Sequence, residues 1–147
     1  MRGSETREVG SGKENGATRR TISSYRDIEA YQRSMKILAP LHQLIRTLPK
    51  EEQFELASQM RRAAKSIPAN IGEGYALKRS AAHFRSRLDI ALGSANEMVI
   101  HLEIAAAIGY FTHDQVAPFI AEYEIIGKQI YRLAQNWRTF DGKRSST

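Results

Sequence analysis

Four stretches of the chain carry apolar residues at every third or fourth position, and this repeat constrains the fold more than any other feature. Such spacing places apolar side chains on one face of an α-helix. No stretch shows the sustained alternation of apolar and polar residues typical of a strand, so we expect no sheet. The stretches span about residues 27–47, 54–75, 80–108 and 112–137. The sequence therefore predicts an all-α, antiparallel up-down-up-down four-helix bundle.

The four stripes predict which side chains form the core. In the first two stretches they are Ile28, Tyr31, Met35, Leu38, Leu41, Ile45 and Leu48, then Phe54, Ala57, Met60, Ala64, Ile67, Ile71 and Tyr75. In the last two they are Phe84, Leu88, Ala91, Leu92, Ala95, Met98, Val99, Leu102, Ala105 and Ala106, then Val116, Phe119, Ile120, Tyr123, Ile126, Gly127, Ile130, Leu133 and Trp137.

Prolines and glycines inside the stripes predict local irregularities. Pro40 predicts a kink in the first helix, because proline removes one backbone hydrogen bond. The second stripe stays in phase across Pro68, so we expect this helix to continue through Pro68 with a bend. The alternative is a break at Pro68 followed by a short helix. Gly72 and Gly74 would let the chain loosen after that point.

Helix ends and chain ends are also marked. Gly109 predicts the end of the third helix, and Thr112-His113-Asp114-Gln115 has the form of a capping box that begins the fourth. The first residues hold many glycines, serines and threonines and almost no aliphatic side chains, so they cannot offset their ordering entropy. We therefore expect a disordered basic tail over 1–24, the bundle over 25–138, and a second disordered tail over 139–147.

Positive charge is concentrated in the first half of the chain. The net charge is +6, and the stretch 56–88 holds seven basic residues against the single acid Glu73, whereas 89–137 holds two basic and six acidic residues. Such asymmetry favours an anionic partner, nucleic acid above all, although a solvated helix face would look the same. The candidate nucleic-acid-binding residues are Arg61, Arg62, Lys65, Lys78, Arg79, Arg85 and Arg87.

These candidates divide into two groups, and the first, Arg61, Arg62 and Lys65, lies on the flank of the second apolar stripe. Arg61 and Arg62 suit phosphate, but they suit carboxylates of a neighbouring helix or subunit equally well. Asn70 and Glu73 are interpreted either as partners for backbone groups at the Pro68 bend or as subunit contacts. The later group lies on the link and first turns of the third helix, where we expect it to face solvent; its members are Lys78, Arg79, Arg85 and Arg87.

Several kinds of chemistry are disfavoured. The chain has no cysteine, which removes disulfides, thiolate metal sites and cysteine nucleophiles. Gly10-Ser11-Gly12-Lys13 lacks the residues and the preceding strand of a phosphate-binding loop. Glu97 and His101 share a helix face, but no second copy completes a di-iron site. We expect no enzymatic activity, cofactor or metal. No apolar run approaches a membrane span, and the N-terminus has no apolar core of a signal peptide, so a soluble cytoplasmic protein is expected.

One run of residues carries a family resemblance. The twenty residues Leu56–Tyr75 (LASQMRRAAKSIPANIGEGY) resemble the signature of four-helix-bundle proteins encoded in bacterial 23S rRNA intervening sequences, often labelled ribosomal-protein-like. Looser matches are 48–52, Ile90–Ser94 with Glu97, and Leu102–Tyr110. The resemblance covers roughly 25–137. It implies a bundle that assembles into a ring, typically of five subunits. It also implies kinship with the accessory protein of diversity-generating retroelements, which binds nucleic acid and a reverse transcriptase.

Two non-enzymatic functions follow. The first is a homo-oligomeric ring that binds RNA or another nucleic acid through its basic surface. Few aromatic residues look free to stack on bases, so weak sequence preference and steep salt dependence are expected. The second is a protein adaptor or scaffold that docks a partner, such as a reverse transcriptase or a ribosome-associated protein, without binding nucleic acid itself.

Overall fold

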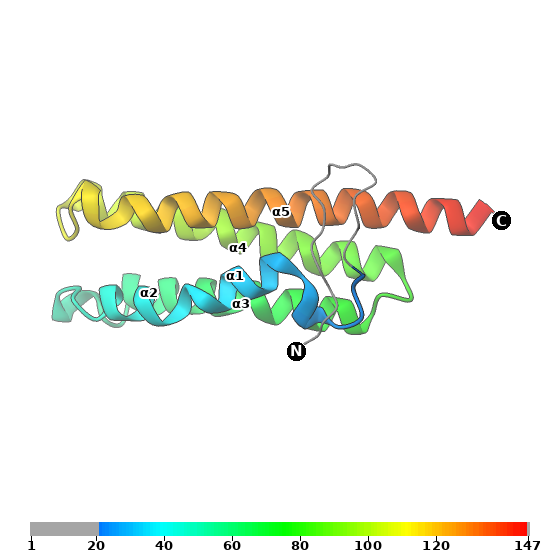
Figure 1. Cartoon of the computed structure of the whole chain (residues 1–147). Helices are drawn as coiled ribbons and strands as arrows, with labels where there is room; N and C mark the ends of the chain where they lie inside the picture. The colour runs from blue at the N-terminus through cyan, green and yellow to red at the C-terminus, as the bar shows by residue number, and fades with distance from the viewer. Residues whose placement is uncertain (1–20, 147) are drawn as a thin grey trace.

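The chain folds into long helices packed side by side, as Figure 1 shows. The computed structural model describes residues 21–146, with side-chain environments through Trp137. The first arm is split into two short helices, and three long helices follow with alternating direction (Figure 1). The elements are η1 (Tyr25–Asp27), α1 (Glu29–Lys36), α2 (Leu38–Ile45), η2 (Lys50–Glu52), α3 (Leu56–Ala76), α4 (Ala81–Ile108) and α5 (His113–Ser146).

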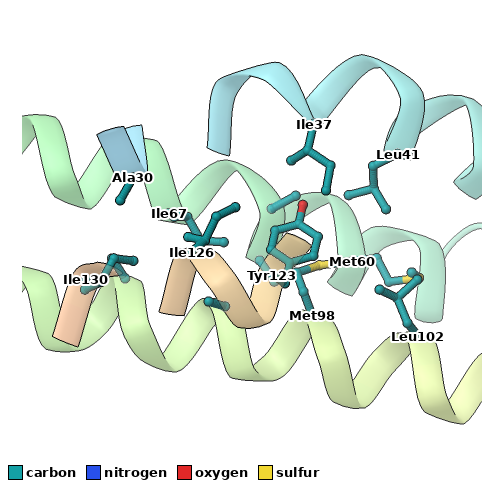
Figure 2. Packing of buried hydrophobic residues seen from close by; sticks show 14 of the residues in the cluster. Ala30, Ile37, Leu41, Met60, Ile67, Met98, Leu102, Tyr123, Ile126 and Ile130 are labelled. Atoms are coloured by element: carbon teal, nitrogen blue, oxygen red, sulfur yellow. The ribbon is translucent and has the colours of Figure 1, made fainter. Parts of the chain in front are cut away.

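The core lies along the centre of this bundle. Figure 2 shows Ile67, Met98 and Tyr123 meeting between the long helices, with Ile37 and Leu41 covering them from the first arm. The expected stripes of α4 and α5 are buried or half-buried throughout. The predicted four-helix arrangement and absence of strands are confirmed over the described residues.

The first arm differs from its prediction. The helix is interrupted at Ile37, and Pro40 sits in the first turn of α2 rather than kinking a continuous helix. The proline lacks a donor, and its ring crowds the carbonyl four residues back, which is that of Lys36, the last residue of α1. The irregularity therefore falls one turn before the proline.

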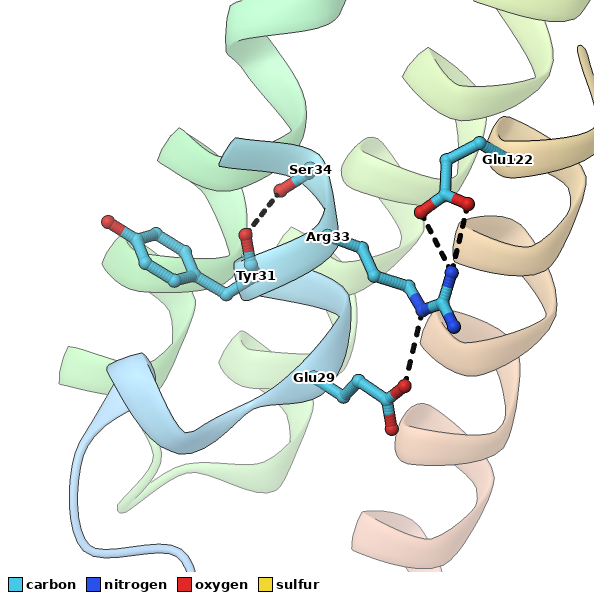
Figure 3. Close-up of polar contacts among 5 residues, drawn as sticks. All are labelled: Glu29, Tyr31, Arg33, Ser34 and Glu122. Carbon is cyan, nitrogen blue, oxygen red and sulfur yellow. Dashed lines mark hydrogen bonds and ion pairs between the residues drawn. The ribbon is translucent and has the colours of Figure 1, made fainter. Parts of the chain in front are cut away.

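The face that the first arm buries is also shifted. Ala30 and Ser34 are buried, whereas Met35, expected in the core, is 45% exposed. The two small residues let α1 approach its neighbours closely, and the Ser34 hydroxyl donates to the Tyr31 carbonyl at 2.9 Å (Figure 3). A second error is Phe54, which is 92% exposed because it lies in the turn before α3 begins.

The long helices follow the sequence closely. α3 runs unbroken through Pro68, which confirms continuity over the alternative of a break. Gly109 ends α4 with φ of 99°, a conformation that favours glycine. The capping box at α5 forms, since Thr112 Oγ1 accepts from Gln115 N at 3.1 Å and Gln115 Oε1 accepts from Thr112 N at 2.8 Å.

The chain ends relate differently to the predicted tails. Residues 1–20 of the expected N-terminal tail lie outside the described residues. Ser24, at its end, caps η1 by accepting from Arg26 N. At the other end, α5 continues as a helix to Ser146, past the position where we expected a tail to begin. It extends beyond the α3–α4 turn in Figure 1.

Candidate nucleic-acid interface

The seven candidate cations spread over α3, the turn that follows it and the first turns of α4. Arg62, Lys65, Lys78 and Arg79 are exposed, and the other three are half-buried. Figure 1 places the α3–α4 turn at one end of the bundle, opposite the end where α2 meets α3. The candidates therefore run along α3 towards this end rather than forming one compact pocket.

Arg87 is already engaged within the chain. Its Nη1 donates to Asn70 Oδ1 at 3.0 Å and to Glu73 Oε1 at 2.9 Å, so it bridges α4 to α3 while its side chain stays 39% exposed. The cause is the close approach of the helices at Gly74, where an added Cβ would lie 2.8 Å from the Cβ of Arg87. Arg87 is thereby removed from the group of free cations.

A polar seam continues from Arg87 along the same helix pair. Asn70 Nδ2 donates to the Ser66 carbonyl at 2.9 Å and to Ser66 Oγ at 3.0 Å. Ser94 Oγ on α4 donates to Ser66 Oγ at 2.9 Å. Asn70 thus satisfies a backbone carbonyl in the turn that contains Pro68, as one of the two sequence interpretations expected. The seam fixes the register of α3 against α4.

Arg61 has a local structural role. Its Nη2 donates to Gln53 Oε1 at 2.7 Å, and Gln53 Nε2 in turn donates to the Leu48 carbonyl at 3.0 Å. The guanidinium therefore braces the α2–α3 connection. No carboxylate among residues 21–137 bonds it, but one of its guanidinium nitrogens already donates to Gln53.

The remaining five candidates, which we together call the basic surface, are Arg62, Lys65, Lys78, Arg79 and Arg85, and Lys65 borders the groove between α1 and α3. Among the described residues, none of them lies within ion-pair distance of a carboxylate. Lys78 Nζ instead lies 4.5 Å from the centre of the Tyr75 ring. The first turn of α4 carries no acid, so the positive end of its dipole adds to these cations.

Arg33 on α1 is a cation that carboxylates of the same chain neutralise (Figure 3). Its Nη1 donates to both carboxylate oxygens of Glu122 on α5 at 2.9 Å, and its Nε donates to Glu29 at 3.2 Å. Hydrogen bonding to Glu122 is the main cause that raises the pKa of Arg33. This α1–α5 link was not anticipated from the sequence, because the two residues are far apart in the chain.

A second surface was also missed by the sequence analysis. Ile90, Ile100, Ile104 and Ile108 on α4 are between 41% and 55% exposed. Their spacing places them on one side of α4, opposite the stripe that faces the core. We call this side the α4 outer face. A helix that is apolar on both sides is expected where a second protein surface covers the outer one.

The residues considered for metal or catalytic chemistry remain apart. His101 Nε2 lies 3.0 Å from Glu97 Oε2, which confirms that this pair shares a helix face. Within the described part of the chain, no three His, Asp or Glu side chains gather in a group that could hold a metal ion. Glu122 bonds Arg33, whereas Glu124 lines a groove against α4, so these two carboxylates face different ways. No described helix has the length and apolar character needed to cross a membrane.

Comparisons with known proteins agree with this architecture. A crystal structure of a protein of unknown function from the S23 ribosomal protein family of Bacteroides thetaiotaomicron superposes with a TM-score of 0.66 at 28% sequence identity. The match covers 73% of this chain and 96% of that chain. No match was found among curated proteins. Residues 26–132 match the family model of the 23S rRNA-intervening sequence protein. The chain therefore belongs to the 23S rRNA-intervening sequence protein family.

Proposed function

We propose that this protein is a non-enzymatic RNA-binding bundle that acts as a homo-oligomer. The observation that carries the proposal is the basic surface, whose five cations have no carboxylate partner among the described residues. By contrast, Arg33 and Arg87 are paired within the chain. Unpaired guanidinium and ammonium groups remain available for phosphate.

The expected mechanism is neutralisation of phosphates with release of counterions. Lys78 and Arg79 lie in the α3–α4 turn, directly before the N-terminus of α4, where backbone N–H groups and the helix dipole also favour an anion. Arg62 and Lys65 extend positive charge along α3. Contacts of this kind position a nucleic acid without reading its sequence, so binding should be general and sensitive to salt.

The α4 outer face supports the oligomeric part of the proposal. Four half-exposed isoleucines on one helix side form the kind of apolar surface that interfaces cover. We propose that a second copy of the chain packs on it. A contact between two different patches of neighbouring copies closes into a ring when the rotation allows, and the family resemblance implies a ring of five subunits.

The RNA-binding part is tested by changing charge at one end of the bundle only. In the double variant Lys78→Gln with Arg79→Gln, we expect weaker RNA binding. For single-stranded RNA, the slope of log K against log salt concentration should become smaller in magnitude by about 0.7 for each lost phosphate contact. Arg46→Gln with Lys50→Gln is the matched control, because both residues are exposed cations near the α2–α3 connection. Fluorescence anisotropy at several salt concentrations measures both effects.

These measurements distinguish the RNA-binding function from the protein-adaptor function. Equal losses in the test and control variants would show that binding depends only on net charge. Absence of RNA binding by the unaltered protein at low salt would refute the RNA-binding proposal and leave the protein-adaptor function.

A further inference from the structure

The groove between α4 and α5 collects the two basic residues of an otherwise acidic half of the chain. The stretch 89–137 contains only Lys128 and Arg132 as Lys or Arg, against six acids, and both line this groove. They lie four positions apart on α5, one helical turn. The groove has a volume of about 610 Å³, and its other lining residues are Leu92, Asn96, Glu124, Gly127 and Tyr131.

Tyr131 supplies an aromatic surface in this groove. Its side chain is 55% exposed, and Gln135 Nε2 donates to its hydroxyl at 2.6 Å, which holds one end of the ring. Two other tyrosines are less available, since Arg26 lies over the Tyr25 ring and Lys78 lies over the Tyr75 ring. Few free aromatic residues are expected from the sequence, and Tyr131 lies outside the four apolar stripes.

The cations of the groove are free within the described structure. Neither Lys128 nor Arg132 makes a hydrogen bond or ion pair with another described residue. Glu124 lines the same groove four positions before Lys128, so the lining residues carry two positive charges and one negative charge. The excess positive charge favours an anionic occupant, and Glu124 marks the side of the groove that phosphate avoids.

The groove continues from the basic surface. Arg85 lies seven residues, or two helical turns, before Leu92 on α4, so both residues occupy the same flank of the helix. From Arg85 to Asn96 the flank extends for about 16 Å at the rise of an α-helix. A nucleic-acid strand that contacts Lys78 and Arg79 at the end of the bundle can therefore follow this flank into the groove.

We propose that the α4–α5 groove is a base-stacking site for single-stranded RNA. Tyr131 stacks against a base, Lys128 and Arg132 bind the neighbouring phosphates, and the Asn96 amide offers a donor and an acceptor to the base edge. This combination of an exposed aromatic ring with flanking cations is the one that single-strand binding proteins use. The inference rests on the proposed RNA-binding function and adds the form of RNA that is bound.

The test compares ring removal with ring retention. For a labelled single-stranded poly(U) oligonucleotide, we expect Tyr131→Ala to weaken binding by about 5- to 150-fold, the effect of losing one stacked base. Tyr131→Phe keeps the ring and should bind nearly as the unaltered protein does. A duplex RNA should bind both variants equally, because its bases are not open for stacking.

Charge variants and cross-linking test the rest of the site. Lys128→Gln should reduce the magnitude of the slope of log K against log salt concentration by about 0.7, because one phosphate contact is lost. Glu124→Gln should strengthen RNA binding, because it removes the negative charge of the groove. An oligonucleotide containing 5-iodouridine should cross-link to Tyr131 on irradiation, as mapped by peptide mass spectrometry. Cross-linking only elsewhere would contradict the proposed site.

The same measurements distinguish an error in the groove site from an error in the RNA-binding function as a whole. If Tyr131→Ala binds poly(U) like the unaltered protein while Lys78→Gln with Arg79→Gln binds it weakly, the groove is not the site and the basic surface is retained. If the unaltered protein binds neither single-stranded nor duplex RNA, both proposals are wrong.

Discussion

Tyr123 is the largest of the side chains that the described core buries completely, and its hydroxyl finds no hydrogen-bond partner among the described residues. Burial raises the pKa of this tyrosine, with a smaller contribution from the charge of Glu122. Figure 2 shows its ring between α3, α4 and the first arm. A buried polar group without a hydrogen-bond partner destabilises the folded state relative to an apolar group of the same shape.

We therefore predict that Tyr123→Phe raises the free energy of unfolding by about 1 kcal/mol at neutral pH. The free energy of unfolding also depends on pH. Tyr123 ionises near pH 10 in the unfolded chain and at higher pH when buried, so the folded state loses stability as the pH rises above about 10. Tyr123→Phe should lose less stability there. Denaturant titrations at about pH 7 and pH 11 measure both effects.

Tyr110→Phe provides the contrasting case. The Tyr110 hydroxyl donates to Glu52 Oε2 at 2.7 Å and ties the α4–α5 connection to η2. Removing this hydroxyl should lower stability, the opposite of the result at Tyr123. If both substitutions change stability in the same direction, hydrogen-bond satisfaction does not explain them.

At the scale of the element, α3 carries two glycines with different environments. From the sequence, both glycines were expected to let the chain loosen after Pro68, but α3 continues through Gly72 and Gly74. At Gly74 an added Cβ would lie 2.8 Å from Arg87 Cβ and 3.0 Å from Phe84 Cδ1. At Gly72 the nearest atom would be Tyr25 Cδ1 at 3.6 Å, an ordinary contact. Only Gly74 is required for packing.

This difference predicts opposite effects of the same substitution. Gly72→Ala should stabilise the protein by about 0.5–1 kcal/mol, because alanine favours a helix. Gly74→Ala should destabilise it by about 1–3 kcal/mol, because α3 and α4 must separate. Thermal or urea unfolding distinguishes the two. Stabilisation by Gly74→Ala would mean that the helices do not approach as closely as described.

At the scale of the whole molecule, polar and apolar surfaces are segregated. The basic surface runs along α3 to the α3–α4 turn, the α4 outer face is lined with isoleucines, and the α4–α5 groove carries the two cations of the second half. A monomer would leave the α4 isoleucines in water. Their burial against another copy would gain hydrophobic free energy without covering the flank of α4 that faces α5.

We predict that Ile100→Asp with Ile104→Asp prevents the proposed homo-oligomer from forming and leaves monomers. Charged side chains on this face cannot be buried without a partner, so assembly should fail while the fold persists. Met35→Asp, on α1 and also half-exposed, is the control. Light scattering after size-exclusion chromatography gives the mass, and circular dichroism verifies helix content. An unchanged mass in the double variant would place the interface elsewhere.

The sequence alone determined the long helices α3 and α4 and the start of α5, because apolar spacing, a capping box and a helix-ending glycine act within a few residues of one another. It also identified the candidate cations. Only the tertiary structure decided which cations are free, since the partners of Arg33 and Arg87 come from other helices and are brought near by packing. The same reason applies to Met35, Ala30 and the outer isoleucines: periodicity shows that a helix has an apolar face, but contact between helices decides which face is buried.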